Sequence, residues 1–225
     1  MTNTAALVLL SGGQDSTTCL AWALANFDMV EAVAFDYGQR HAVELDSAEL
    51  VANEAGVFLR TVPVSGLGGS SLTDHSAAVT VDGGMGGLPS TFTPGRNAVF
   101  LSIAAGIAAQ GGITNLVTGI CQTDYSGYPD CRRSTIDAME RALSLGVGQA
   151  GTAEPWAIRV WTPLMWIDKA ATVRMARRLP GCWEALALTH TCYYGQQPPC
   201  GDCPACEIRA RGFAQANEAD PLLGQ

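Results

Sequence analysis

A glycine turn near the N-terminus carries residues suited to binding phosphate. Residues 11–18 read Ser-Gly-Gly-Gln-Asp-Ser-Thr-Thr and lie between an apolar run and a helical pattern. The two glycines let the backbone turn tightly and approach a ligand closely. The first N–H groups of the following helix and the positive end of its dipole form a natural phosphate site. Ser16 and Thr17 add hydroxyl donors, and Asp15 can either cap the helix or contact a metal ion bound to phosphate.

The same turn has a plain structural interpretation, as a well-capped connection between a strand and a helix. Gly-Gly followed by Asp-Ser also occurs by chance. The turn is not a Walker A loop, because no Lys follows the glycines. It is not a dinucleotide-binding loop either, because Gly-x-Gly-x-x-Gly is absent. The complete Ser-Gly-Gly-x-Asp-Ser string, in the first turn of an α/β pattern, favours an anion-binding loop.

Four of the eight cysteines lie close together near the C-terminus, which indicates a metal site. A cluster of this kind in a reducing compartment is typical of metal binding rather than of disulfides. Four thiolates complete a closed tetrahedral zinc site, which is structural rather than catalytic. An iron–sulfur cluster is the rival interpretation, since Cys-x2-Cys-x2-Cys also ligates clusters. Four unpaired surface thiols at this density would be unusual. The sequence favours zinc held by Cys192, Cys200, Cys203 and Cys206.

Two further segments carry polar and aromatic side chains that suit a ligand. Arg96, where a loop meets an apolar helix, can pair bidentately with a phosphate or carboxylate. Asn97 can cap that helix, although, taken alone, the segment is better explained as a loop anchored by Pro89 and Pro94. Residues 119–131 contain carboxylates and tyrosines suited to a flat heterocycle with N–H donors. An ordinary turn with a buried tyrosine is the alternative. The candidates there are Asp124, Tyr125, Tyr128 and Asp130.

The elements that position these residues follow a β-α-β-α-β pattern. Continuous apolar strands indicate a parallel sheet covered on both faces. In such sheets ligands bind beyond the carboxyl ends of the strands, where the glycine turn lies. We expect an α/β, Rossmann-like fold, with a synthetase domain over residues 1–188 and a metal-binding segment over 189–225. The expected strands are 5–10, 30–35, 58–62, 116–119 and 157–161; the expected helices are 15–26, 44–55, 96–110, 135–145 and 168–178, with a long glycine-rich loop at 65–93.

Composition sets limits on the class of protein. The chain has 225 residues, of which 48% are hydrophobic and 15% charged, so one domain can bury a sizeable core. The net charge of −8 argues against a nucleic-acid partner. No apolar run approaches the roughly 20 residues that span a bilayer. The N-terminal residues lack the basic region of a secretory signal, so we expect a cytosolic protein without membrane contact.

The first loop resembles the PP-loop of N-type ATP pyrophosphatases, which split ATP between the α and β phosphates. Together with segments 88–97, 119–132 and 191–206, in that order, the chain resembles the 7-cyano-7-deazaguanine synthase family of queuosine biosynthesis. The resemblance covers nearly the whole chain. The Ser-Gly-Tyr-Pro-Asp-Cys string and the four-cysteine spacing are its most specific parts. Leu10 stands where Phe is expected in this family, and residues 66–87 show no matching motif.

This resemblance implies an ATP-dependent carbon–nitrogen ligase. The family converts 7-carboxy-7-deazaguanine and ammonia into the nitrile 7-cyano-7-deazaguanine (preQ0), releasing AMP and diphosphate. The carboxylate is adenylated, ammonia displaces AMP to give an amide, and a second ATP activates the amide oxygen for loss. The resemblance also implies Mg²⁺, Zn²⁺ and a homodimer.

The resemblance assigns roles to individual residues. Asp15, Ser16 and Arg96 are expected to be catalytic, and the four cysteines to bind zinc. The deazaguanine is expected to contact Arg96, Asp124, Tyr128 and Asp130. The ATP site is expected to comprise Leu10, Ser11, Gly12, Gly13, Gln14, Asp15, Ser16, Thr17, Thr18, Cys19 and Leu20.

Two other functions fit parts of the sequence. A PP-loop tRNA thiolation enzyme shares the first loop, but it needs a basic surface or an added RNA-binding domain, and the acidic chain shows neither. A zinc-stabilised nucleotide-binding protein without turnover shares both the loop and the cysteines. Sequence alone does not separate binding from turnover, because both use the same loop.

Overall fold

A computed structural model of the chain describes residues 4–40, 43–74, 76–123, 127–147 and 157–224. Its centre is a five-stranded parallel sheet in the order β3-β2-β1-β4-β5. The expected α/β fold is therefore confirmed. The strands are β1 (Ala5–Leu9), β2 (Met29–Asp36), β3 (Leu59–Pro63), β4 (Asn115–Val117) and β5 (Arg159–Trp161).

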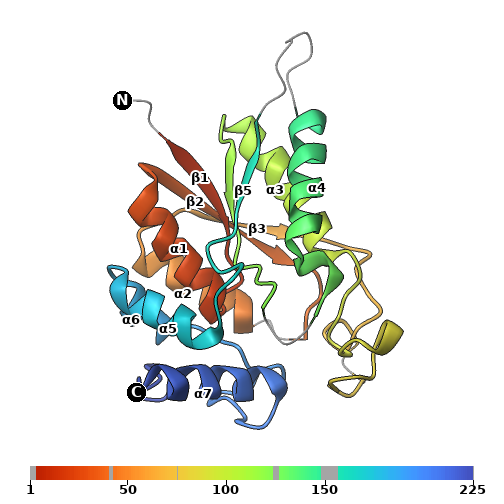
Figure 1. The fold of residues 1–225 in the computed structure, drawn as a ribbon, viewed down its shortest axis with the longest axis vertical. Helices are drawn as coiled ribbons and strands as arrows, with labels where there is room; N and C mark the ends of the chain where they lie inside the picture. The colour runs from red at the N-terminus through yellow and green to blue at the C-terminus, as the bar shows by residue number, and fades with distance from the viewer. Residues whose placement is uncertain (1–3, 41–42, 75, 124–126, 148–156, 225) are drawn as a thin grey trace.

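Helices cover both faces of the sheet (Figure 1). Helices α1 and α2 pack on one face and α3 and α4 on the other, while α5 and α6 pack beside α1. No described helix is both long and apolar enough to cross a membrane. The helices are α1 (Gln14–Asn26), α2 (Val43–Glu54), α3 (Arg96–Gln110), α4 (Arg133–Gly146), α5 (Lys169–Arg178), α6 (Cys182–Leu186) and α7 (Pro204–Ala216), with short 3-10 turns η1 (Met85–Gly87) and η2 (Pro129–Cys131).

Strand β1 explains why the sheet has two cores. Side chains alternate across a strand, so Leu7 packs with the α3 and α4 side while Ala6 and Val8 pack with the α1 and α2 side. All three are at most 1% exposed. A strand buried on both faces must be apolar throughout, which is the continuous pattern seen in the sequence.

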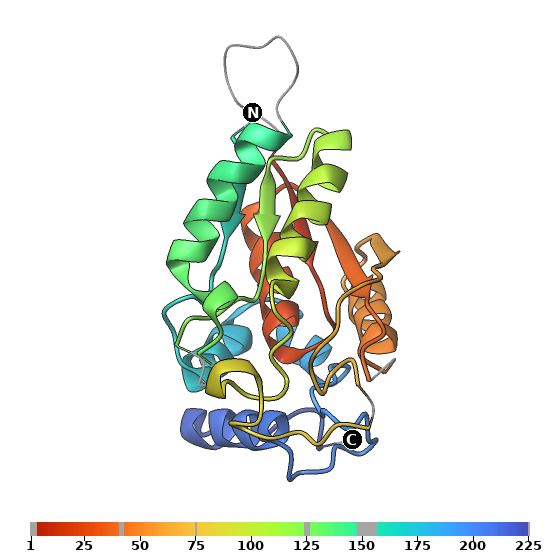
Figure 2. The same ribbon diagram turned by 90° about the vertical axis from the view of Figure 1, so that its right-hand side faces the viewer.

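The chain reverses its direction of winding between β1 and β4. From β1 it proceeds to β2 and β3 on one side, and then crosses through α3 to β4 on the other side. The carboxyl ends of β1 and β4 therefore flank a topological switch point, the usual ligand site of such sheets. Figure 2 shows β4 pointing toward the end of the molecule where α7 lies.

Two features near the C-terminus differ from the sequence-based expectation. Helix α6 was not predicted, because five residues carry little helical periodicity; it follows Gly181, whose φ of 69° starts a new direction. Helix α7 begins at Pro204, within the cysteine segment, and packs along α5. The cysteine segment is therefore partly helical rather than wholly a turn.

Gly12 occupies the most constrained position in the fold. Its φ is +83°, and a Cβ atom there would lie 2.2 Å from the carbonyl oxygen of Glu44 and 2.7 Å from the amide nitrogen of Ala48. Both contacts are with backbone of α2, which moves only if the helix moves. A side chain at this position would separate the phosphate loop from α2.

We expect Gly12→Ala to lower the free energy of unfolding by roughly 2–4 kcal/mol, from left-handed strain plus overpacking. Urea unfolding followed by circular dichroism measures this. Gly106→Ala is the matched control, because Gly106 lies within α3 with open space around the added atom; it should gain about 0.5–1 kcal/mol. Equal stabilities of the two variants would contradict the described packing.

Candidate active site

The loop after β1 is closed by its own hydrogen bonds. The Ser16 hydroxyl donates to the carbonyl oxygen of Gly13 at 3.1 Å and accepts from the backbone N–H of Ser11 at 3.1 Å. Among the described residues, no side chain caps the N-terminus of α1, which begins directly after Gly13. The first turn of α1 lines the cleft, so its backbone dipoles point toward any anion bound there.

Asp15 pairs with a lysine from a distant part of the chain. Lys169 Nζ lies 2.6 Å from Asp15 Oδ2. Asp15 therefore does not cap α1, which was one of the two roles considered for it. Its second oxygen, Oδ1, is buried with no hydrogen-bond partner among the described residues. An unpartnered buried carboxylate oxygen beside a phosphate site is a natural place for a cation.

Lys169 was missed in the sequence because its signal is indirect. It is the first residue of α5, directly after Asp168, whose Oδ1 accepts the N–H of Ala171 at 2.7 Å. Asp168 thus caps the N-terminus of α5. Because Asp168 sets where α5 begins, the next residue, Lys169, lies at the cleft.

The cleft at the switch point has a volume of about 350 Å³. Its walls come from the phosphate loop, the carboxyl ends of β1, β2 and β4, the first turns of α2, α3 and α5, and the C-terminal segment. Leu72, from the long glycine-rich loop, also lines it. That loop is pinned by Ser70, whose hydroxyl lies 2.7 Å from the Thr93 hydroxyl.

Arg96 reaches the cleft from the first turn of α3. Its Nη1 donates to the Tyr37 hydroxyl at 3.4 Å, and its guanidinium carbon lies 5.9 Å from the centre of the Tyr37 ring. Burial lowers the pKa of Arg96, but Tyr37 and Asp130 outweigh burial and raise it. The guanidinium therefore stays charged, as a group that binds carboxylate or phosphate must.

The residues expected to contact a heterocycle do not all meet in the cleft. Tyr128 lines it; its hydroxyl hydrogen-bonds to Thr91. Asp130 is buried outside the lining, and its Oδ2 accepts the backbone N–H of Asn97 at 3.2 Å. Asp130, rather than the Asn97 side chain, thus satisfies the first turn of α3. Asp124 lies outside the described residues.

The C-terminal segment forms one wall of the cleft. The N–H of His190 donates to the Gly12 carbonyl at 2.9 Å, which ties this segment to the phosphate loop. Arg209 of α7 lines the cleft and pairs with Asp220 at 2.6 Å, with both groups at most 7% exposed. Arg209 also donates from Nη1 to the Thr189 hydroxyl at 2.8 Å, and this buried contact ties α7 to the segment that precedes it.

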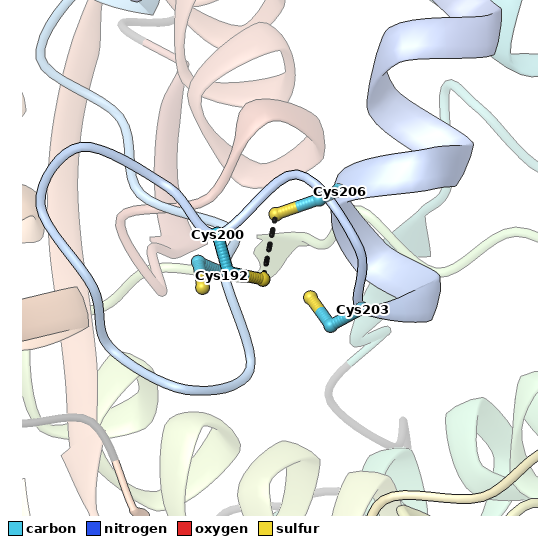
Figure 3. A group of neighbouring side chains, drawn as sticks. All are labelled: Cys192, Cys200, Cys203 and Cys206. Atoms are coloured by element: carbon cyan, nitrogen blue, oxygen red, sulfur yellow. Dashed lines mark hydrogen bonds between the residues drawn. The ribbon is translucent and has the colours of Figure 1, made fainter.

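The four cysteines of the C-terminal segment converge on one point (Figure 3). Their sulfur atoms all lie within 4.8 Å of one another, and those of Cys200 and Cys206 are 3.8 Å apart. Thiolates about 2.3 Å from a tetrahedral ion lie about 3.8 Å apart, so the donor set fits a single ion. Burial raises the pKa of Cys192, but backbone N–H donors outweigh it and lower the pKa to about 7. Burial raises the pKa of Cys206 and raises that of Cys200 to about 11, so of these three thiols only Cys192 favours the thiolate before metal arrives.

Glu44 was missed as a cleft residue in the sequence. It follows β2, so the rule that ligands bind beyond the carboxyl ends of the strands also applied to it. Arg40, which also follows β2, donates from Nη1 to the Ala77 carbonyl at 3.0 Å.

A phosphate loop at the switch point of a parallel sheet, in a cleft that a charged guanidinium also lines, defines a nucleotide-dependent α/β enzyme. The chain belongs to the family described as "Queuosine biosynthesis protein QueC", whose model matches residues 5–217. The family assignment made from the sequence motifs is therefore confirmed.

Individual relatives agree with this family. A 7-cyano-7-deazaguanine synthase from Laribacter hongkongensis is 52% identical over 226 residues, covering 98% of this chain and 94% of the relative. One of the same name from Chromobacterium violaceum is 52% identical and covers 97% and 92%. A solved structure, the U34-tRNA thiolase NcsA from Methanococcus maripaludis with its [4Fe-4S] cluster, is 15% identical with a TM-score of 0.48, covering 96% of this chain and 66% of that one. At that distance it bears on neither substrate nor cofactor.

We expect the purified protein to carry one metal ion per chain, measured by inductively coupled plasma mass spectrometry. Cys206→Ser removes one of four ligands and should lose most of the metal. Cys121→Ser is the matched control, because Cys121 bonds to Thr123 and the Ile167 carbonyl outside the cluster. Equal metal content in both variants would contradict the site.

Proposed function

We propose that this chain converts 7-carboxy-7-deazaguanine, ammonia and ATP into 7-cyano-7-deazaguanine, with release of AMP and diphosphate. The observation that carries the proposal is full-length similarity, at 52% identity, to proteins named for this product. A carboxylate is a poor electrophile and an amide oxygen is a poor leaving group. Adenylating first one oxygen and then the other corrects both faults in a single cleft.

The phosphate loop is proposed to bind the triphosphate of ATP. The segment from Leu10 to Leu20 contains the loop and the helix it opens, and Ser11, Gly13, Asp15 and Ser16 of this segment line the cleft. Backbone N–H groups at a helix N-terminus stabilise the charge of a departing diphosphate. Mg²⁺ would add further charge stabilisation there, and the buried Oδ1 of Asp15 fits that cation. Lys169 holds Asp15 in place and adds positive charge.

Arg96 is proposed to bind the reacting carboxylate. Its charged guanidinium lines the same cleft as the phosphate loop, and bidentate pairing would fix one carboxylate oxygen for attack. Tyr128 is proposed to bind the flat deazaguanine, since its ring borders the cleft and packs at 5.2 Å against the Phe92 ring. Asp124 is retained as a proposed acceptor for substrate N–H groups. Asp130 is better suited to positioning α3 than to direct contact, because Asn97 uses its Oδ2.

The metal of the four-cysteine site is proposed to be zinc. The sulfur separations suit one ion, and an iron–sulfur cluster of several iron atoms would hold its ligands farther apart. All four positions of the ion are filled by protein, so its role is structural. It would fix the segment that bonds to Gly12 and carries the cleft wall.

The remaining expectations belong to the same proposal. The net charge of −8 supports small molecules rather than nucleic acid as partners. A cytoplasmic location suits an ATP-consuming enzyme with several free thiols. The homodimer and the division of the chain at residue 188 stay predictions.

The direct test is to incubate the metal-loaded protein with 7-carboxy-7-deazaguanine, ATP, Mg²⁺ and ammonium, and to identify products by mass spectrometry. We expect the nitrile together with AMP. Omitting ammonium should leave the carboxylic acid unconverted. If the folded protein yields neither nitrile nor AMP, the proposal fails and only a nucleotide-binding function is left.

A further inference from the structure

Glu44 differs from every other acidic residue of α2. It is the second residue of the helix and lines the cleft, whereas Asp46, Glu49 and Glu54 are exposed. Its own carbonyl oxygen is the atom packed against Gly12. The backbone of Glu44 is therefore fixed directly beside the phosphate loop, and its side chain shares the cleft with whatever that loop holds.

The groups that act on Glu44 come from two other elements. Arg96 at the start of α3 attracts its negative charge, and Tyr37 after β2 is close enough for its pKa to respond to Glu44. Within the described part of the chain, no side chain forms a hydrogen bond or ion pair with the Glu44 carboxylate. Its backbone is held in place by the helix, and among the described residues its carboxylate has no hydrogen-bonding partner.

Two described carboxylates line the cleft, and they are not equivalent. Asp15 is bound to Lys169 at 2.6 Å, which ties it to the phosphate loop. Burial raises the pKa of Glu44 from 4.5 to about 7, and Arg96 offsets this only in part. Burial also raises the pKa of two tyrosines that line the cleft, Tyr37 and Tyr128, which makes them poor bases at neutral pH. A group that titrates near the working pH can accept a proton and return it to water.

The chemistry of the proposed reaction demands such a group. Ammonia carries N–H protons and the nitrile product carries none, so every one of them must leave during a turnover. When ammonia attacks the acyl-adenylate, a C–N bond forms, the C–O bond to AMP breaks, and the nitrogen loses one proton. When the activated amide loses its oxygen with the second AMP, the nitrogen loses its two remaining protons as the triple bond forms.

We propose that the Glu44 carboxylate is the general base that takes these protons in turn. The inference rests on the proposed synthase function and adds a catalytic residue to it. Arg96 and Glu44 then have separate roles in the cleft. The Arg96 guanidinium binds the substrate oxygen that is activated. The Glu44 carboxylate takes protons from the substrate nitrogen that replaces this oxygen. Each proton passes from Glu44 to solvent before the next is removed.

The test separates proton removal from adenylation. Exchange of labelled diphosphate into ATP, with 7-carboxy-7-deazaguanine and no ammonia, reports adenylation alone. Conversion of the amide intermediate to nitrile with ATP reports the step that loses two protons and involves no ammonium ionisation. Both are measured for the wild type, Glu44→Gln, Glu44→Asp and Asp46→Asn, the last being an exposed neighbour on the same helix turn.

We expect Glu44→Gln to keep diphosphate exchange within about threefold while nitrile formation falls about 10²–10⁴-fold. In the wild type the amide-to-nitrile rate should rise with pH through about 7 and then level off, because the ionised carboxylate is the active form. That rise should vanish in Glu44→Gln. Glu44→Asp keeps a base and should restore part of the rate, and Asp46→Asn should match the wild type.

Three results would be decisive against the base. Nitrile formation by Glu44→Gln within about tenfold of wild type overturns it. So does a parallel loss of exchange and nitrile formation in both Glu44 variants, which indicates a positioning role instead. So does a Glu44→Asp variant with normal exchange whose amide-to-nitrile rate does not vary with pH. Failure of the wild type to exchange diphosphate contradicts the synthase function itself and is thereby distinguishable.

Thermal unfolding of each Glu44 variant and of the wild type shows whether the variants are folded. The pKa of Glu44 in the folded state lies above its ordinary value, so its contribution to stability is complete below about pH 4.5 and is lost as pH rises through about 7. Removing the charge should therefore leave Glu44→Gln at least as stable as the wild type above pH 7.

Discussion

The close contact at Gly12 is the constraint on which the rest of the site depends. Because Gly12 has no side chain, the phosphate loop can touch the backbone of α2 at Glu44. The Gly12 carbonyl also accepts the N–H of His190 from the C-terminal segment. One residue thus joins three stretches of chain that are far apart in sequence. The sheet supplies the switch point, but this contact decides which side chains surround the ligand there.

The four-cysteine site and the cleft are linked through the hydrogen bond between His190 and Gly12. Cys192 lies two residues after His190, so any ion held by the cysteines also fixes the segment that bonds to Gly12. Arg209, on the helix that carries Cys206, lines the cleft and is locked by Asp220. A metal bound there would stabilise the geometry of the phosphate loop without taking part in the chemistry.

The sequence predicted those parts of the molecule that local patterns encode. The continuous apolar strands, the phosphate loop and the four-cysteine spacing each lie within a short stretch, and the α/β fold and the family followed from them. Contacts made across the chain were not predictable: Lys169 meets Asp15 over 154 positions, and Asp130 turned out to cap α3 rather than to line the cleft. Glu44 resembles any acidic residue in a first helical turn until the fold places it beside Gly12.

The central claim is that one cleft activates both oxygens of the same carboxylate by adenylation. The most direct measurement uses 7-carboxy-7-deazaguanine with ¹⁸O in both carboxylate oxygens and follows the label by mass spectrometry. The account predicts that every AMP formed on the path to nitrile carries one ¹⁸O, the first from the acid and the second from the amide. Labelled and unlabelled AMP in equal amounts, or ¹⁸O released as phosphate or water, would contradict it.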